Sequence, residues 1–276
     1  MTPQNLLFFA ELLHRRTGIL IDETKDYLVK TRLAPIAGTS GYADIDALID
    51  AIRDRPEARV VDAALDAMTT NETFFFRDQT PFEVLRTLLS DPGRRGAGPL
   101  RIWSAAASTG QEAYSIAMLC DELPHLSAEN AVEIVGTDIS QSCLTKAAAG
   151  VYSSFEIQRG LPIQKLTRYF DKDGESWRAK NELRSRVTWK RHNLMDSPWA
   201  LGRFDIVFCR NVLIYFDIST RRRILDLVAG QMQNGGHLFL GASETTLGVT
   251  NAFAQTNRAG CWIKADASAA PHALSA

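Results

Sequence analysis

Cysteine is scarce in this chain of 276 residues, which contains only four. The four are far apart in the sequence and form no C-x-x-C pair, and no histidine stands near them at zinc-finger spacing. These absences exclude a disulfide framework and a zinc-ribbon site. We therefore expect buried free thiols in a reducing compartment at Cys120, Cys143, Cys209 and Cys261.

Long apolar runs are also missing. No run approaches the roughly 20 residues that a membrane-spanning helix needs, and the first five residues lack the basic and apolar regions of a signal peptide. We therefore expect a cytoplasmic protein without direct membrane insertion. The net charge is only -1 at pH 7, which gives no global attraction to nucleic acid. Any docking surface must be a local patch.

The chain begins with a helical part. Residues 1–70 carry apolar stripes at helical spacing, separated by glycine and proline, and they predict an all-helical domain. In residues 69–78, polar residues directly precede and follow three consecutive phenylalanines. They fit either a helix start with buried aromatics or a polar edge at a ligand. We therefore assign residues 71–99 to a cofactor-contacting segment and a linker, the linker being residues 90–99.

From residue 100 the pattern alternates between strands and helices, which predicts an α/β fold with a parallel sheet. Helices are expected at 111–123 and 219–233. The expected strands are 101–104, 132–137, 187–190, 204–209 and 236–240, followed by an antiparallel edge pair near 253–256 and 261–264. Residues 100–265 thus form the second domain, and the Ala/Ser/Pro-rich residues 266–276 are expected to be a disordered tail.

Residues 151–192 interrupt this alternation and are too long for a simple connection. They hold ten Lys and Arg against five Asp and Glu. In a nearly neutral chain, this excess indicates either a solvated face or a docking site for an acidic partner.

The most informative turn is poor in glycine. Residues 105–110 read Ala-Ala-Ala-Ser-Thr-Gly and join a predicted strand to a predicted helix. Their small side chains let the backbone approach a ligand closely. A nicotinamide-binding turn needs G-x-G-x-x-G and a P-loop needs Gly-Lys-Ser/Thr, and neither is present. Alanine and serine suffice if the ligand carries an amino acid in place of a diphosphate, which fits S-adenosylmethionine.

Polar residues after the other predicted strands agree with this ligand. Asp138 follows the second strand, where a carboxylate can accept both ribose hydroxyl protons, although aspartate also caps helices there. Asn193 and Leu194 follow the third strand and can contact the adenine edge. Arg210 and Asn211 follow the fourth. Each position alone fits a structural role, but their order along the chain favours a ligand site.

Four segments closely resemble the chemotaxis receptor glutamate methyltransferases of the CheR family. They read Thr-Thr-Asn-Glu-Thr-Phe-Phe-Phe-Arg (69–77), Ser-Ala-Ala-Ala-Ser-Thr-Gly-Gln-Glu-Ala-Tyr-Ser (104–115), Gly-Thr-Asp-Ile (136–139) and Phe-Cys-Arg-Asn-Val-Leu-Ile-Tyr-Phe (208–216). The resemblance extends to about residue 264. It implies a Rossmann-like class I S-adenosylmethionine-dependent methyltransferase with an N-terminal all-helical domain and a small inserted β-subdomain, here residues 151–192. It also implies a set of cofactor-binding residues: Asn71, Thr73, Arg77, Glu112, Asp138, Asn193, Leu194, Arg210 and Asn211.

The resemblance further implies methylation of glutamate side chains in the cytoplasmic domain of chemoreceptors, with recruitment to membrane-bound receptor arrays. The products would be glutamate methyl esters and S-adenosylhomocysteine. A carboxylate nucleophile is already ionised near neutral pH, so neither a strong general base nor a metal is expected. Catalysis then rests on alignment and on exclusion of water. Arg77 is the candidate to hold a carboxylate, Glu112 to bind the cofactor's ammonium group, and Tyr215 to line the transfer site, although Tyr215 also fits a half-buried structural aromatic.

Two departures from the family pattern matter. Residues 171–185 are a few residues shorter than in relatives that bind a C-terminal receptor pentapeptide, so we expect pentapeptide-independent action. Pro35 follows closely after Arg32-Leu33 and is expected to end its helix early.

Two other functions stay open. A nucleic-acid methyltransferase is disfavoured because residues 209–212 replace the Asp/Asn-Pro-Pro-Tyr/Phe turn of base amino methylation, and because Cys209 ends an apolar strand. A non-catalytic cofactor-binding scaffold is the second. No long heptad pattern is present, so we expect a monomer.

Overall fold

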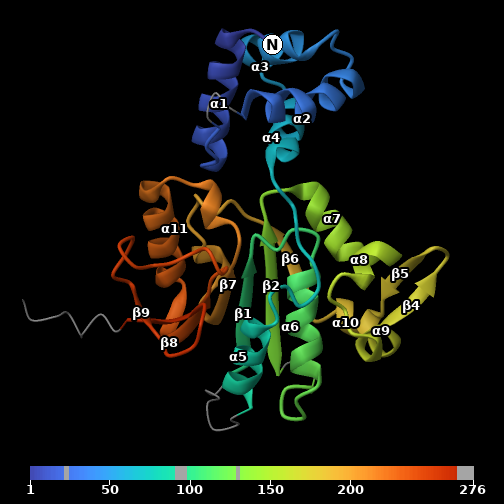
Figure 1. The fold of residues 1–276 in the computed structure, drawn as a ribbon, viewed down its shortest axis with the longest axis vertical. Coiled ribbons are helices and arrows are strands. Elements are labelled where there is room, and N and C mark those ends of the chain that lie inside the picture. Colours follow the sequence, from blue (N-terminus) through green and yellow to red (C-terminus); the bar gives the residue numbers. More distant parts are fainter. Residues whose placement is uncertain (22–24, 91–97, 129–130, 266–276) are drawn as a thin grey trace, which may run out of the picture. The chain divides into compact units, whose positions relative to one another are not determined.

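The computed structural model describes residues 1–21, 25–90, 98–128 and 131–265, and the chain divides into two compact units (Figure 1). The first unit comprises Met1–Asn71 and Tyr215–Thr220, and the second comprises Glu72–Ile214 and Arg221–Ala276. None of the helices in the described ranges has the length and apolar character needed to cross a bilayer. The expected tail, 266–276, and most of the expected linker, 90–99, lie outside the described residues.

The first unit is helical, as the apolar stripes predict. Its helices are α1 (Pro3–Thr17), α2 (Asp26–Thr39), α3 (Ile45–Asp54) and α4 (Ala58–Met68). Their apolar faces meet in one core, to which Phe9, Leu13, Val29, Leu48 and Ile49 contribute fully buried side chains. The stripes seen in the sequence are therefore the core-facing sides of these helices.

The expectation that Pro35 ends its helix is wrong, because α2 continues through it to Thr39. A proline inside a helix removes one backbone hydrogen bond and costs about 3 kcal/mol. Leu33 and Ala37 flank Pro35 at a spacing of four residues, and both are buried in the core of this unit. Their packing on one helix face offsets the loss.

Arg32 is used inside the first unit. Its Nη1 donates to the carbonyl oxygens of Met68 at 2.7 Å and Thr69 at 3.1 Å, and its Nη2 donates to the Thr70 hydroxyl at 3.1 Å. These acceptors lie at the C-terminal end of α4, where the helix dipole favours a cation. Arg32 therefore fixes the chain just before Asn71.

A seven-stranded sheet in the order β6-β2-β1-β7-β8-β10-β9 forms the frame of the second unit. Its strands are β1 (Leu100–Ala105), β2 (Val132–Asp138), β6 (Val187–Arg191), β7 (Phe204–Cys209), β8 (Met232–Phe239), β9 (Phe253–Gln255) and β10 (Cys261–Lys264). Five strands of this sheet, β1, β2, β6, β7 and β8, pair in parallel. The last two are antiparallel at the edge. The predicted strand order along the chain and the antiparallel edge pair are confirmed.

The boundary between the last helix and β8 differs clearly from the prediction. The helix expected to reach residue 233 is α11 (Ile218–Gly230), and β8 begins at Met232 rather than at residue 236. Met232 pairs with Phe204 of β7, and both side chains are fully buried. Pairing with a neighbouring strand therefore ends the helix earlier than its periodicity suggests.

Helices α5 (Thr80–Leu89) and α6 (Gln111–Asp121) cover one face of the sheet. Phe82 and Leu85 of α5 share a core with Ile102, Ile134 and Phe208 from three strands. Helix α7 (Gln141–Ala149) follows β2, and Ser140 caps its start by accepting the Cys143 N–H at 3.1 Å. All four cysteines of the chain are buried free thiols, as expected.

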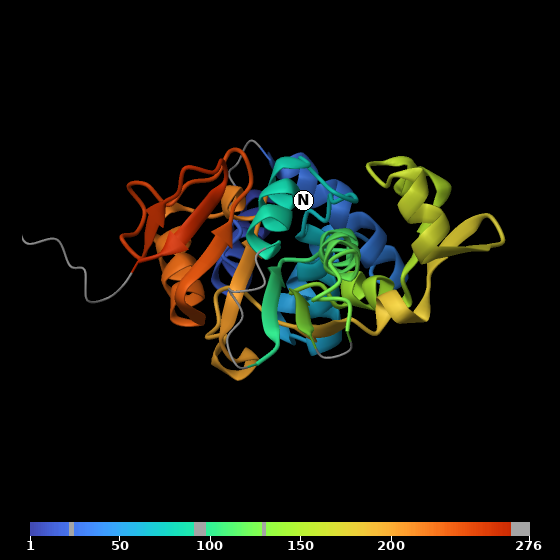
Figure 2. The ribbon, with the colours of Figure 1, turned by 90° about the horizontal axis from the view of Figure 1, so that it is seen from below.

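The interruption of the alternation folds as a small sheet of its own in the order β3-β5-β4. Its elements are β3 (Val151–Ser153), α8 (Ser154–Gln158), α9 (Ile163–Tyr169), β4 (Phe170–Asp173), β5 (Ser176–Ala179) and α10 (Asn181–Arg184). We call residues 151–186 the insert. Strand β6 lies within the expected range 151–192 but pairs with β2 in the main sheet. Figures 1 and 2 both show the insert and β9 at opposite ends of the second unit.

Candidate functional site

The predicted site residues that follow β1, β2 and β7 lie at the carboxyl edge of the main sheet. Ala105, the last residue of β1, pairs with Thr137 of β2 on one side and with Cys209 of β7 on the other. The turns that leave these three strands therefore start side by side. Open α/β sheets bind their ligands in the crevice at this edge.

The small-residue turn after β1 is strongly bent. Ala106 has φ 57°, Ser108 has φ 51° and Gly110 has φ 97°, all in the left-handed region. Such a conformation costs a non-glycine residue roughly 1–3 kcal/mol, and it persists because the turn is bonded to the next strand. The Ala107 N–H donates to the Thr137 carbonyl at 2.8 Å. At Gly110 a Cβ would lie 2.9 Å from the Ala147 side chain, so the single glycine of the turn is required there.

Asp138 holds this turn in place. Its side chain is only 6% exposed. One carboxylate oxygen accepts the Ser108 N–H at 2.8 Å and the other accepts the Ser140 N–H at 2.9 Å. The aspartate thus links the turn after β1 to the start of α7. The helix cap itself is Ser140 rather than Asp138. Its contact with ribose stays a prediction.

Glu112 and Arg210 form a buried ion pair at the same edge. Glu112 lies in the first turn of α6, and its Oε1 accepts the Ser104 hydroxyl at 2.8 Å. Its Oε2 accepts from Nη1 of Arg210 at 3.0 Å. Nη2 of Arg210 donates to the Asp78 carboxylate at 2.7 Å and to the Arg77 carbonyl at 2.9 Å. The Arg210 side chain is 1% exposed. Its buried guanidinium therefore links α6 and residues 77–78 to the turn after β7.

Residues 72–79 are anchored by their aromatic side chains. Phe75 is fully buried and meets Tyr152 and Phe170 of the insert edge to face, with centroid distances of 5.1 and 5.6 Å. The Phe76 N–H donates to the Ser115 hydroxyl of α6 at 3.0 Å. The phenylalanines therefore fix this segment between the insert and α6.

Arg77 lies within this anchored segment. Its Nη1 donates to the Glu72 carbonyl at 2.9 Å, and its guanidinium carbon lies 5.5 Å from the centre of the Phe74 ring. Thr73 is half-buried in the same segment. Carboxylate binding by Arg77 and cofactor binding by Thr73 stay predictions.

The chain after β6 reaches the same edge. The His192 N–H donates to the Asp138 carbonyl at 3.0 Å, and Oδ1 of Asn193 accepts the Met195 N–H at 3.0 Å. Leu194 is buried. Burial lowers the pKa of His192, against the opposing charge of Asp196. Asn193 and Leu194 are thus held beside the Asp138 turn, and their contact with adenine stays a prediction.

Glu244 is a functional candidate that the sequence analysis missed. Its carboxylate accepts the N–H groups of Asn211 at 2.7 Å, Val212 at 2.9 Å and Leu213 at 2.7 Å, all in the turn after β7. It also accepts the Gly241 N–H at 2.7 Å. Glu244 lies beyond the end of β8, and its four partners are backbone N–H groups, which leave no residue-specific signal in the sequence.

Two predicted site residues belong to the first unit. Asn71 donates from its side-chain amide to the Thr69 hydroxyl at 3.0 Å. The Tyr215 carbonyl accepts the Leu20 N–H at 3.3 Å. The participation of Asn71 and Tyr215 in the site stays a prediction.

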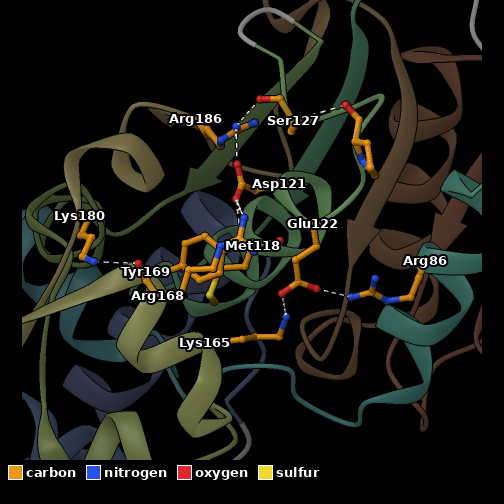
Figure 3. A network of polar contacts seen from close by, with 11 residues as sticks. Arg86, Met118, Asp121, Glu122, Ser127, Lys165, Arg168, Tyr169, Lys180 and Arg186 are labelled. Atoms are coloured by element: carbon orange, nitrogen blue, oxygen red, sulfur yellow. Dashed lines mark hydrogen bonds and ion pairs between the residues drawn. The ribbon is translucent and has the colours of Figure 1, made fainter.

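Much of the positive charge of the insert is used to hold the insert in place. Four of its basic residues make ion pairs with acids outside the insert: Arg159, Lys165, Arg168 and Arg186. Arg178 and Lys180 pair with acids inside it. At the C-terminal end of α6, Asp121 binds Arg168 and Arg186 at 2.7 Å each, and the neighbouring Glu122 binds Lys165 and Arg86 (Figure 3). The Tyr169 hydroxyl also donates to Asp121 at 2.9 Å. The charge excess is therefore largely structural, a role that neither sequence interpretation named.

Cys209 is not a nucleophile. Its side chain is fully buried at the end of β7, and burial followed by the charges of Glu244 and Glu112 raises its pKa well above that of an ordinary thiol. A neutral buried thiol cannot attack a base, which argues against cytosine-type methylation. Among the described residues, no group of three or more His, Cys, Asp or Glu side chains is placed to hold a metal ion.

The residues at this edge fit S-adenosylmethionine. Nε of Arg210 is buried and has no hydrogen-bond partner among the described residues. The carboxylates of Glu112 and Asp138 stand on either side of a turn without bulky side chains. A ligand with an amino group, a carboxylate and ribose hydroxyls supplies partners for groups of these kinds.

Comparison with known proteins gives matches along most of the chain. The family profile described as "CheR methyltransferase, SAM binding domain" matches residues 71–260, and the profile "CheR methyltransferase, all-alpha domain" matches residues 4–69. Chemotaxis protein methyltransferase Cher2 of Pseudomonas putida is 43% identical over 261 residues, which cover 90% of this chain and 94% of that protein. Chemotaxis protein methyltransferase 1 of Pseudomonas aeruginosa is 44% identical over 242 residues, covering 86% and 88%.

Solved structures give a weaker match. The glycopeptide N-methyltransferase MtfA complexed with S-adenosylmethionine aligns with a TM-score of 0.37 and 16% identity, covering 63% of this chain and 58% of that one. A TM-score this low supports no conclusion beyond those that the family profiles give.

Proposed function

The chain belongs to the CheR methyltransferase family and is an S-adenosylmethionine-dependent chemotaxis protein methyltransferase, and from this premise we propose that it methylates specific glutamate side chains in the cytoplasmic domain of chemoreceptors. The observation that carries the proposal is the buried Arg210–Glu112 pair beside the small-residue turn that Asp138 holds. This arrangement places two carboxylates and a guanidinium at the ligand edge of the sheet.

The residues of this edge act by binding and orientation. Glu112 holds the ammonium group of the cofactor, Asp138 the ribose hydroxyls, and Asn193 and Leu194 the adenine edge. Arg77 holds a carboxylate. When bound, S-adenosylmethionine supplies a methyl group on a positively charged sulfur. Transfer of that methyl group to a glutamate oxygen would give a glutamate methyl ester and leave S-adenosylhomocysteine.

No proton transfer is needed in this step, because the glutamate is already ionised. The protein would accelerate it by orienting the glutamate toward the cofactor's methyl group and by excluding water. We assign Tyr215 to the wall of this transfer site. The absence of an activated cysteine at Cys209 is consistent with such a direct displacement.

The proposal is tested by incubating the protein with methyl-labelled S-adenosylmethionine and a purified receptor cytoplasmic domain, and then by measuring base-labile methanol. Glu112→Gln is expected to lower kcat/KM for S-adenosylmethionine by at least tenfold, because the ammonium contact is a charge-assisted hydrogen bond worth about 1.5–3 kcal/mol. Glu133→Gln is the matched control. Glu133 pairs with Arg101 at 2.8 Å at the opposite end of β2, so kcat/KM should stay within twofold. Labelled cofactor that binds without forming ester indicates the alternative, a non-catalytic scaffold.

We also propose that the enzyme acts without a receptor pentapeptide. The β4–β5 hairpin supports this, because Asp173 pairs directly with Ser176 and only Gly174 and Glu175 lie between them. A receptor domain with its last five residues removed should be methylated at an unchanged rate. A loss of tenfold or more on truncation would contradict this part of the proposal.

The proposed function also has consequences for the oligomeric state of the protein and for where it binds its receptors. We propose recruitment of a cytoplasmic monomer to membrane-bound receptor arrays. Light scattering of the purified protein tests the monomer, and co-sedimentation with receptor-containing membranes tests the recruitment. A dimeric mass would overturn the first, and equal sedimentation with receptor-free membranes the second.

A further inference from the structure

The turn after β7 is shaped by a residue from a distant part of the chain. We propose that Glu244 is a positioning residue for cofactor binding, which acts by fixing the backbone of residues 211–213 and thereby the placement of Arg210 and Asn211. This inference rests on the proposed function.

The geometry around Glu244 is that of a carboxylate held by backbone donors. Oε2 accepts the N–H groups of Asn211 and Gly241, and Oε1 those of Val212 and Leu213, at distances from 2.7 to 2.9 Å. Three successive N–H groups that converge on one anion form a nest. The fourth donor comes from the residue that follows β8 by two positions, so Glu244 ties the ends of two neighbouring strands together.

Only a carboxylate can accept all four of these backbone N–H groups. Each oxygen accepts two N–H groups, and an amide in its place would turn its own NH₂ group toward two backbone donors. Asn211 has φ 58°, a left-handed conformation that the three bonds of the nest stabilise. At Gly241, a Cβ would lie 2.7 Å from Nδ2 of Asn211 and 2.8 Å from Oε2 of Glu244. The position thus leaves no room for a side chain beside the nest.

The turn that Glu244 holds carries the residues of the site. Arg210 immediately precedes the nest, and its guanidinium is bonded to Glu112 at 3.0 Å and to Asp78 at 2.7 Å. Displacing the backbone of Asn211 therefore moves Arg210 relative to Glu112. Glu244 makes no direct bond to Glu112 or Arg210 in the described contacts, so its influence passes through the turn.

The test measures binding of S-adenosylhomocysteine by calorimetry in the full chain, together with the thermal midpoint. Glu244→Gln should raise the dissociation constant at least tenfold, the loss expected when a hydrogen bond to a charged group is removed. The amide hydrogens of Asn211, Val212, Leu213 and Gly241 should exchange faster in the variant. In turnover assays, KM for S-adenosylmethionine should rise by a larger factor than kcat falls.

Glu133→Gln serves as the matched control, because it removes a carboxylate that also accepts two charge-assisted bonds, from Arg101 at 2.8 and 2.9 Å. It should lower the thermal midpoint and leave the dissociation constant within twofold. Gly241→Ala is a second route to the nest if Glu244→Gln does not fold, and it should weaken binding in the same direction.

The proposed function and the positioning role of Glu244 can fail separately. If the wild-type protein does not bind S-adenosylhomocysteine, the proposed function fails. If the wild type binds it and the folded Glu244 and Gly241 variants bind within twofold of the wild type, the positioning role is refuted while the proposed function stands. An equal loss of affinity in Glu133→Gln would also overturn the positioning role, because the effect would then be one of general stability.

Discussion

Arg210 offers the sharpest quantitative prediction for the site. We consider Arg210→Met, which keeps an apolar stem of similar length beside the Phe82 ring, 5.8 Å from the guanidinium in the wild type. The change removes the partner of Glu112, whose side chain is only 12% exposed, and of Asp78, whose side chain is 42% exposed. Losing the contact with Glu112 costs more than losing the contact with Asp78, because water screens only the charge of the exposed Asp78.

The magnitude follows from burial. Removing one partner of a buried ion pair costs about 3–5 kcal/mol, since the other charge is left without compensation. The exposed Asp78 adds at most about 1 kcal/mol. We therefore expect the free energy of unfolding of the second unit to fall by about 3–6 kcal/mol. For a domain of this size the thermal midpoint should fall by about 6–24 °C.

The double variant Arg210→Met/Glu112→Gln isolates the pair. Neutralising Glu112 removes the uncompensated charge, so the double variant should be more stable than the sum of the single changes predicts, by about 1–3 kcal/mol. Urea denaturation followed by tryptophan fluorescence gives all four free energies. A cost below about 1 kcal/mol for Arg210→Met, or additive effects in the double variant, would refute the view that this buried pair holds the site together.

Four further predictions test separate parts of the account. Asp138→Ala should weaken S-adenosylhomocysteine binding at least tenfold by calorimetry, because it removes a charged acceptor and frees the turn after β1; unchanged affinity would remove its ribose role. Tyr215→Phe should lower kcat more than it changes cofactor affinity, and equal kcat in steady-state assays would take Tyr215 out of the transfer site. Burial lowers the pKa of His192 below 6.5, so the stability from its neutral form is complete above pH 6.5 and is lost as the pH falls. Denaturation between pH 7.5 and 5 should show this loss, and His192→Gln should lessen it; parallel profiles would contradict the assignment. Gly160→Ala should destabilise the protein by more than about 1 kcal/mol, since its Cβ would lie 2.0 Å from a backbone carbonyl oxygen, whereas Gly174→Ala, with the same left-handed backbone and open space around it, should cost less in the same denaturation assay.

The sequence predicts the frame of the molecule well. Strands such as 204–209 are short apolar runs that end in polar residues, and such runs have few other stable arrangements in an alternating chain. The positions of Asp138 and Arg210 at the end of β2 and just after β7 follow from the rule that parallel strands share one carboxyl edge. Local pattern and topology are sufficient for these features.

Long-range packing accounts for the errors. Pro35 does not end α2, because Leu33 and Ala37 pack into the same core on both sides of it. The start of β8 at Met232 depends on pairing with Phe204, nearly thirty residues earlier. Neither partner is visible in the local pattern, so propensity alone gives the wrong boundary.

Two features of the site could not be deduced from residue types. The basic residues of the insert bind Asp121, Glu122 and other acids that are remote in the sequence, so counting charge within the insert overstates its free charge. Glu244 acts on backbone N–H groups about thirty residues away, and backbone donors carry no residue-specific signal. The polar contacts between segments had to come from the structure.

The most direct test of the whole account is the identity of the methylated atom. The protein should be incubated with methyl-labelled S-adenosylmethionine and a receptor cytoplasmic domain, and the receptor should then be analysed by peptide mass spectrometry. The account predicts a gain of one methyl group on defined glutamate side chains, lost on treatment with base and absent when those glutamates are changed to alanine. Stable, base-resistant methylation on another residue type, or no transfer from a protein that binds the cofactor, would contradict it.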